Sequence, residues 1–161
     1  MRIGFGYDVH RLKVGRRCVL CGVEIASDFG PDGHSDADVP VHALMDAMLG
    51  ALALGDIGKH FPDNNQRWKD ADSIEMLKSV YGLVNGKGFV LGNADITVVL
   101  ESPRLSPHIE RMRSVLAGAL GADISAISVK ATTEERLGIT GDGSGIAAYA
   151  VVLLLEQTVN F

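Results

Sequence analysis

The sequence predicts an α/β fold of the α+β kind, a two-layer sandwich in which helices cover one face of a mixed β-sheet. Strand-like and helix-like segments follow one another in the order β-β-α-α-β-α-β-β. The helix-like segments carry apolar residues at the three-to-four spacing of a buried face. The final apolar segment, 146–155, lacks polar alternation, so we expect both of its faces to be buried. Because three helices cover only one face, we expect another subunit to cover the other.

Length and composition predict one folded domain over residues 1–161. The chain is 47% hydrophobic and 22% charged, which is ordinary globular composition. Its net charge of -5 argues against nucleic-acid binding. Its longest apolar run, 146–155, has about half the length that a membrane span needs. Two cysteines and the lack of a signal peptide predict a cytoplasmic protein.

The first two strands are expected at 2–9 and 17–25, with a turn over 13–16 between them. Cys18 and Cys21 form a C-x-x-C motif within the second segment. A zinc ribbon needs a second cysteine pair, which the chain lacks. The two thiols are therefore interpreted as small core residues of a strand.

The first two helices have clear start signals. A polar loop over 27–38 ends at Asp38, which is a good N-cap for a helix that runs to about Leu54, with Pro40 in its first turn. A second polar loop covers 55–72. Ser73 is then predicted to cap a helix that stops at 85–86, an Asn-Gly pair.

The second half of the chain alternates strand and helix. A strand is expected over 89–100, and the Ser-Pro pair at 106–107 begins a third helix that ends at Gly121. Residues 127–131 form the next strand, followed by a short Thr/Glu turn and the final strand, 146–155.

Two histidines and an aspartate predict a metal site. Asp8 and His10 are two residues apart in a strand, so their side chains point to the same face. His42 lies near the start of the first helix. Together they can occupy three corners of a zinc tetrahedron and leave the fourth for water or substrate, which is typical of catalytic zinc. Unrelated polar residues would give the same spacing, so the pattern needs further support.

Other polar residues lie near these ligands in the sequence. The segment 34–36 is close enough to His42 to share its pocket, and Asp46 is one helical turn beyond His42. Asp46 could orient the imidazole, hold a substrate group or simply face solvent. Residues 132–135, Thr-Thr-Glu-Glu, suit phosphate oxygens and Mg²⁺, although T-x-x-E is also a helix-capping box.

Several ungapped sequence motifs follow one another in a fixed order, and together they are far more distinctive than any one of them alone. It carries G-Y-D-V-H-R-L at 6–12, G-H-S-D-A-D-V at 33–39, H-A-L-M-D-A at 42–47, A-L-G-D-I-G-K-H-F-P-D at 53–63, E-S-P-R-L at 101–105, P-H-I at 107–109 and V-K-A-T-T-E-E-R-L-G at 129–138. Over essentially its whole length the chain resembles the 2-C-methyl-D-erythritol 2,4-cyclodiphosphate synthase family of the non-mevalonate isoprenoid pathway. Such enzymes cyclise 4-diphosphocytidyl-2-C-methyl-D-erythritol 2-phosphate and release cytidine monophosphate (CMP).

The resemblance implies the metals and the catalytic residues. Asp8, His10 and His42 would bind Zn²⁺, and Glu135 would hold a second ion, Mg²⁺ or Mn²⁺, on the substrate diphosphate. His34 and Thr133 would stabilise charge in the transition state, and Ser35 would contact the 2-phosphate.

The resemblance also implies the substrate contacts. Near the metals these are Asp8, Val9, His10, His34, Ser35, Asp46, Thr133, Glu134 and Glu135. The methylerythritol pocket would be lined by Asp56, Ile57, Gly58, Phe61, Pro62, Asp63, Asn64 and Asn65. The cytidine site would be formed by Leu100, Glu101, Ser102, Pro103, Arg104, Leu105, Ser106, Ala131 and Thr132. Arg104 stands where many relatives have lysine, and its guanidinium would meet phosphate with different geometry.

The family forms a homotrimer whose sheets pack around the threefold axis, with active sites between subunits. Ile139 and Asp142 are assigned to the same site region but depart from the family pattern, since many members carry Phe and Arg there. That arginine helps bind a phosphate in the central cavity. Asp142 would place negative charge in it, so we expect prenyl diphosphates to bind poorly.

Two other functions are compatible with the same ligands. A zinc phosphohydrolase would use them to activate water, with Glu135 or His34 as general base. A non-enzymatic trimer would use zinc structurally, but three protein ligands argue against this because structural sites are normally closed.

Overall fold

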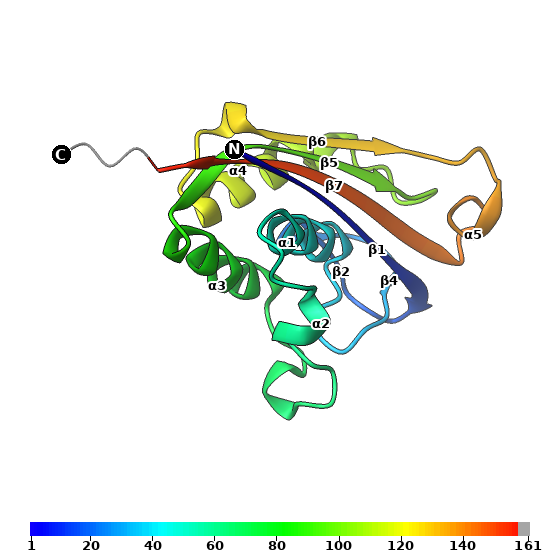
Figure 1. Ribbon diagram of the computed structural model, residues 1–161. Coiled ribbons are helices and arrows are strands. Elements are labelled where there is room, and N and C mark those ends of the chain that lie inside the picture. Colours follow the sequence, from blue (N-terminus) through cyan, green and yellow to red (C-terminus); the bar gives the residue numbers. More distant parts are fainter. Residues whose placement is uncertain (158–161) are drawn as a thin grey trace.

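The computed structural model describes residues 1–157, which form a curved mixed sheet with helices packed against one face (Figure 1). The strand order is β4-β1-β7-β5-β6. These strands are β1 (Arg2–Val14), β4 (Phe29–Pro31), β5 (Phe89–Val99), β6 (Ile127–Thr132) and β7 (Gly145–Glu156). Only the β5–β6 pair is parallel among the strand pairs of residues 1–157. The predicted two-layer arrangement of a mixed sheet and helices is confirmed.

The longest helices supply the second layer. They are α1 (Val39–Ala51), α3 (Ser73–Gly86) and α4 (Ile109–Leu120), and shorter turns of helix lie at α2 (Ile57–His60), η1 (Gln66–Trp68), η2 (Ser106–His108), η3 (Ile124–Ala126) and α5 (Gly138–Gly141). Asp38 caps α1 as expected, because its carboxylate accepts a hydrogen bond from the backbone N–H of Val41. Gly121 ends α4 in the left-handed conformation, also as expected. Every helix within residues 1–157 is too short or too polar to traverse a lipid bilayer.

Two glycines let α1 lie directly on β1. A Cβ atom added at Gly4 would lie 1.8 Å from the carbonyl oxygen of Ala47, and one at Gly6 would lie 1.9 Å from that of Ala43. Such distances are far below van der Waals contact, so only glycine allows this approach. The close packing fixes the distance between β1, which carries Asp8 and His10, and α1, which carries His42.

The prediction of one strand over 17–25 is wrong. The segment forms a hairpin of two short strands, β2 (Cys18–Leu20) and β3 (Val23–Ile25). The turn between them has positive φ angles at both Cys21 (51°) and Gly22 (71°), as a two-residue hairpin requires. Cys18 and Cys21 are both buried and free, so their interpretation as core residues is confirmed even though Cys21 lies in the turn.

Other boundaries also differ from the expectation. Ser73 is the first residue of α3 and its cap is Asp72, whose carboxylate accepts from the N–H of Ile74. Helix α1 ends at Ala51 and not near Leu54. The loop 27–38 contains β4, and the loop 55–72 contains α2 and η1.

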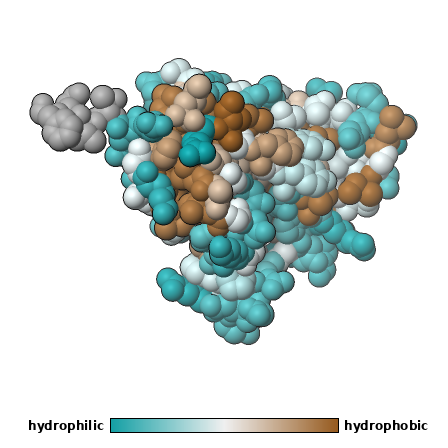
Figure 2. Space-filling view, viewed as in Figure 1, coloured by the Kyte–Doolittle hydropathy of each residue, from teal (hydrophilic) through white to brown (hydrophobic). Residues whose placement is uncertain are grey.

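The sheet face opposite the helices is apolar and exposed. The exposed hydrophobic side chains on β1 and β7 include Ile3, Phe5, Tyr7, Val9, Tyr149 and Val151. The rings of Tyr7 and Tyr149 pack together at a centroid distance of 5.0 Å. Hydrophobic surface gathers along the sheet near the chain start and again at α5 (Figure 2). The expectation that both faces of β7 are buried therefore does not hold for the single chain.

Candidate functional site

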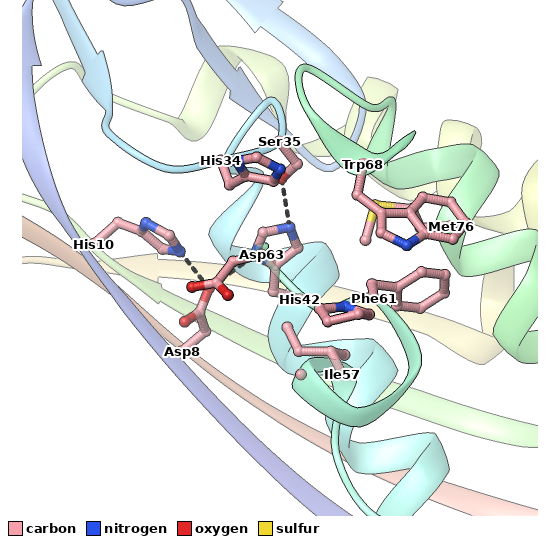
Figure 3. A pocket seen from close by; sticks show the side chains of 12 residues that line it. Asp8, His10, His34, Ser35, His42, Ile57, Phe61, Asp63, Trp68 and Met76 are labelled. Atoms are coloured by element: carbon pink, nitrogen blue, oxygen red, sulfur yellow. Dashed lines mark hydrogen bonds and ion pairs between the residues drawn. The ribbon is translucent and has the colours of Figure 1, made fainter. Parts of the chain in front are cut away.

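Asp8, His10 and His42 come together as the sequence predicts. Alternation along β1 points Asp8 and His10 toward α1, and His42 faces them from the first turns of that helix (Figure 3). Asp8 Oδ2 lies 3.1 Å from His10 Nε2 and 3.1 Å from His42 Nδ1. One ligand atom from each residue lies within 4.8 Å of the other two. These nitrogen and oxygen donors fit a divalent cation such as zinc.

The electrostatics of the cluster favour an ionised Asp8 carboxylate beside a protonated His10. Burial alone would raise the pKa of Asp8, but hydrogen bonds with His10 and His42 outweigh it and hold that pKa well below its ordinary value. The hydrogen bond with Asp8 raises the pKa of His10, although burial opposes the shift. A bound cation would replace the proton that His10 shares with Asp8.

A cavity of about 420 Å³ opens beside the cluster. Figure 3 shows the three ligands on one side of it and Phe61, Trp68 and Met76 on the other. It is lined by the predicted residues Asp8, His10, His34, Ser35, His42, Ile57, Gly58, Phe61, Pro62 and Asp63. Trp68 and Met76 also line it and were missed. Trp68 is the only tryptophan and lies in a polar loop, which is the one signal that could have indicated it.

The loop bearing His34 and Ser35 is held by residues outside the cavity. The Arg16 guanidinium donates to the carbonyls of Gly33 (3.2 Å) and Ser35 (3.3 Å). The backbone N–H of Asp70 donates to the carbonyl of His34 at 2.9 Å. Sequence reasoning did not indicate Arg16, because a surface arginine after a turn has no distinctive pattern.

Other predicted residues of the methylerythritol pocket have local structural roles in the single chain. Asp56 caps α2 by accepting from the N–H of Lys59. Asn65 caps η1, and its carbonyl oxygen lies 3.4 Å from His34 Nε2. Asn64 is exposed.

Asp46 does not orient His42. Its carboxylate accepts from the backbone N–H of Ile57 at 2.7 Å and so anchors α2 to α1. Burial raises the pKa of Asp46, although this hydrogen bond opposes the shift. His42 Nε2 instead contacts Ser35 Oγ at 3.2 Å and Ser73 Oγ at 3.0 Å.

A second cavity, of about 300 Å³, gathers most of the residues predicted to bind cytidine. It lies where β5 and β6 end, beside the start of α4. Its lining consists of Leu100, Glu101, Pro103, Arg104, Leu105, Ser106, Ile109, Ala131, Thr132 and Thr133. Ser102 is absent from the lining, and Ile109 was not predicted. This cavity shares no lining residue with the cavity at Asp8, His10 and His42.

The remaining predicted residues do not line the cavity beside the metal cluster. Thr133 Oγ1 donates to Glu135 at 2.8 Å, and Thr140 Oγ1 donates to Glu134. Ile139 and Val9 line a third cavity together with the cluster residue His10, and the exposed Asp142 carboxylate accepts from the N–H of Ser144. Hydrogen bonding by the side chain of Ser144, together with its backbone N–H, lowers the pKa of Asp142. Within the described residues, Glu135 is not part of the ligand group formed by Asp8, His10 and His42.

Comparison with known proteins gives consistent matches. The model of the YgbB family matches residues 1–155. Two curated proteins named 2-C-methyl-D-erythritol 2,4-cyclodiphosphate synthase are similar over nearly their whole length. That of Geobacter sulfurreducens is 57% identical over 157 residues, covering 98% of this chain and 100% of the relative. That of Clostridioides difficile is 54% identical over 160 residues, covering 99% of each.

Solved structures of synthases share the fold. A CDP-bound 2C-methyl-D-erythritol-2,4-cyclodiphosphate synthase has a TM-score of 0.88 and 40% identity, covering 96% of this chain and 100% of that one. The bifunctional IspDF of Campylobacter jejuni has a TM-score of 0.93 and 43% identity, covering 96% of this chain and 42% of that one.

Proposed function

The chain belongs to the YgbB family, and from this membership and the geometry of the site we infer that it is a lyase that forms 2-C-methyl-D-erythritol 2,4-cyclodiphosphate. Its substrate is 4-diphosphocytidyl-2-C-methyl-D-erythritol 2-phosphate. An oxygen of the 2-phosphate bonds to the diphosphate phosphorus nearer the methylerythritol. The P–O bond to the cytidine-bearing phosphate breaks, and CMP leaves with that electron pair. The observation that carries the assignment is the Asp8, His10 and His42 cluster at the edge of a cavity in a chain of this family.

The chain's own residues bring two anionic phosphates together. His34 and Ser35 line the cavity beside the cluster, where they would donate hydrogen bonds to phosphate oxygens. Zn²⁺ held by Asp8, His10 and His42 would supply positive charge to the substrate phosphates. Mg²⁺ or Mn²⁺ on Glu135 would neutralise the diphosphate. Phe61 and Trp68, whose rings meet edge to face at 4.9 Å, would exclude water from the methylerythritol.

The second cavity would bind the cytidine. Its lining by segments 100–106 and 131–133 supports this role, as does the nucleotide bound to two solved relatives, one the IspF of Plasmodium falciparum. Thr133 lines this cavity, and once a cation on Glu135 takes the place of the Thr133 proton, its hydroxyl would hydrogen-bond to the charge that develops as CMP leaves. Residues 1–161 would thus form one synthase domain.

We propose that the working form is a homotrimer with each active site between two subunits. Two observations support it. The sheet face opposite the helices exposes an apolar row that water would otherwise cover. The cluster and the cytidine cavity share no lining residue within one chain, so a substrate spanning both is better accommodated by halves from two copies.

Product analysis tests the activity. Incubated with the substrate and Mg²⁺, the protein should release CMP and the cyclic diphosphate in equal amounts. Because the attack is intramolecular, product formed in ¹⁸O-labelled water should carry no label at phosphorus. A linear product, or one labelled by solvent, would instead support a phosphohydrolase that activates water, the alternative for which the comparisons give no support.

A further inference from the structure

We infer that Asp36 and Ser73 are positioning residues that hold the His42 ring with its proton on Nε2 and its Nδ1 lone pair directed at the metal site. The inference deepens the proposed function and rests on it, since it concerns how the same metal cluster is prepared. Neither residue lines the cavity beside the cluster, and the sequence placed Asp36 near His42 and Ser73 at a helix start without indicating that they contact the imidazole.

The contacts connect three distant segments. Ser73, the first residue of α3, is fully buried, and its Oγ lies 3.0 Å from His42 Nε2. Asp36 lies in the loop before α1 and receives two hydrogen bonds from Ser73. The Ser73 backbone N–H donates to Oδ2 at 3.0 Å, and its hydroxyl donates to Oδ1. The carboxylate, the hydroxyl and the imidazole therefore form one chain of hydrogen bonds.

Counting protons along this chain fixes its direction. A serine hydroxyl has one proton, and that of Ser73 is given to the Asp36 carboxylate, which can only accept. Toward His42 the Ser73 oxygen can then only accept, so Nε2 must carry a proton and donate it. Nδ1 lies 3.1 Å from Asp8 Oδ2, so when a cation replaces the proton between these two atoms, the neutral ring presents its Nδ1 lone pair to the metal site.

The same arrangement frees the Ser35 proton. Ser35 Oγ accepts from the N–H of Ala37 at 3.1 Å and lies 3.2 Å from His42 Nε2. Because Nε2 is already a donor, Ser35 does not need to donate to it. The Ser35 hydroxyl proton is then available to a phosphate oxygen in the cavity that Ser35 lines.

The ring of His10 is oriented in the same way, but its acceptor is a backbone carbonyl oxygen. Its Nδ1 lies 2.8 Å from the backbone carbonyl oxygen of Asp32, which can only accept. Its Nε2 faces Asp8 at 3.1 Å and would present its lone pair to a cation that replaces the proton between the two residues. Each histidine of the cluster is thus held through its outer nitrogen, which is how ligand imidazoles are usually oriented.

Zinc affinity tests the inference without any assay of turnover. The dissociation constant of the full-length protein for zinc is measured by competition with a chromophoric chelator, for wild type, Ser73→Ala and Asp36→Asn. Ser73→Ala removes the acceptor. Asp36→Asn keeps the volume but places an N–H₂ donor where two donors converge, which should turn the Ser73 proton toward His42 and favour Nδ1–H. We expect each variant to weaken zinc binding about 10- to 100-fold.

Two control variants separate positioning from folding. Asp72→Ala removes the cap of α3 without touching His42, and Ser79→Ala removes a hydroxyl of the same helix that bonds only to the carbonyl of Glu75. Both should bind zinc within about threefold of wild type. Equal weakening in Asp72→Ala, or unchanged affinity in Asp36→Asn, would overturn the inference. Asp36→Asn decides the matter if Ser73→Ala does not fold.

A spectroscopic measurement gives a second readout. In zinc-loaded, ¹⁵N-histidine-labelled protein, the His42 proton should appear on Nε2, and its resonance should shift in Ser73→Ala but not in Asp72→Ala. A proton on Nδ1 of the wild type would contradict the inference. A wild type that binds no zinc at all would instead defeat the metal assignment in the proposed function, so the two failures are distinguishable.

Discussion

At the scale of single residues, the metal cluster depends on contacts that lie outside it. Asp32, Ser73 and Arg16 each bond to a ligand or to the loop beside the ligands, yet none of them faces the substrate cavity. Residues of this kind decide orientation, and orientation to within a fraction of an ångström decides the affinity of a metal site.

Removing one ligand should remove the metal. His42→Ala is expected to fold but to lose zinc and nearly all turnover, because two remaining ligands cannot hold the ion in place of three. Elemental analysis of the purified variant checks this. His60→Ala is the control, since His60 bonds to the carbonyl of Leu54 and is not part of the cluster. Stoichiometric zinc in His42→Ala would show that the assigned ligands are incorrect.

Asp38 should make stability depend on pH. Its fully buried carboxyl caps α1 and accepts hydrogen bonds from the backbone N–H groups of Cys21 and Gly22. Burial raises the pKa of Asp38 from 3.8 to about 7, although these hydrogen bonds oppose the shift. Because the folded pKa is raised, the contribution to stability is complete below pH 3.8 and is lost as pH rises toward about 7.

The measurement is the free energy of unfolding of the zinc-free protein against pH. Ionisation of Asp38 should lower the free energy of unfolding by up to about 1.4 kcal/mol per pH unit across that interval. Asp38→Asn cannot ionise and should lack this component. An identical pH slope in Asp38→Asn would show that another group titrates.

At the scale of elements, the contact of α1 with β1 sets the spacing of the ligands. Gly6→Ala would place a methyl group against the carbonyl of Ala43, so α1 must move away from the strand. We expect it to cost about 1–3 kcal/mol of stability and to weaken zinc binding, because His42 moves with the helix.

A matched control exists on another helix. A Cβ added at Gly118, within α4, meets nothing within 4 Å, so Gly118→Ala should be neutral or stabilising by about 0.5–1 kcal/mol. Chemical denaturation of both variants compares them. If Gly6→Ala were as stable as Gly118→Ala, the close packing of α1 on β1 would not have the importance argued for it.

The elements that the sequence predicts best are those with a long, regular apolar period. Helix α4 and strand β5 start and end close to their expected residues, because several turns or alternations accumulate the same signal. The hairpin at 17–25 was missed since an apolar run hides its turn. Only Gly22 indicated the turn, and positive φ at a cysteine cannot be foreseen from its residue type.

The site was predictable to a similar extent. Asp8 and His10 were foreseen because strand alternation is a local rule, whereas the partners of His42 were not. Ser73 lies 31 residues from His42 and 37 from Asp36, and no periodicity connects such distant positions. Of the alternatives open for Asp46, orientation of His42 does not hold, since helical spacing puts Asp46 near His42 but tertiary contact gives its carboxylate to the N–H of Ile57.

At the scale of the whole molecule, the exposed sheet face should hold subunits together. Val151, on β7, is 44% exposed in the single chain, so Val151→Lys should fold normally but place a charge in the proposed interface. We expect light scattering to show a smaller species than the trimer proposed for the wild type. Leu83→Lys, a comparably exposed site on α3 at 42%, should stay trimeric.

The charge of Asp142 also affects the whole assembly, because it should oppose the binding of anions near the threefold axis. Three copies of this exposed carboxylate would meet near the threefold axis, so farnesyl diphosphate should bind wild type poorly and Asp142→Arg better. Calorimetry compares the two proteins. Tight binding by wild type would show that Asp142 does not prevent prenyl diphosphates from entering the central cavity on the threefold axis.

The separation of the two cavities has a genetic consequence. A chain with a damaged zinc cluster still carries an intact nucleotide half, and a chain damaged at Thr133 still carries intact zinc ligands. Suppose that a mixture of equal amounts of His42→Ala and Thr133→Val is refolded and that subunits assort at random. Roughly a quarter of the interfaces would then combine the intact zinc ligands of a Thr133→Val subunit with the intact nucleotide cavity of a His42→Ala subunit. Two inactive proteins would then complement each other, and two defective alleles of one gene could together sustain the activity that neither provides alone.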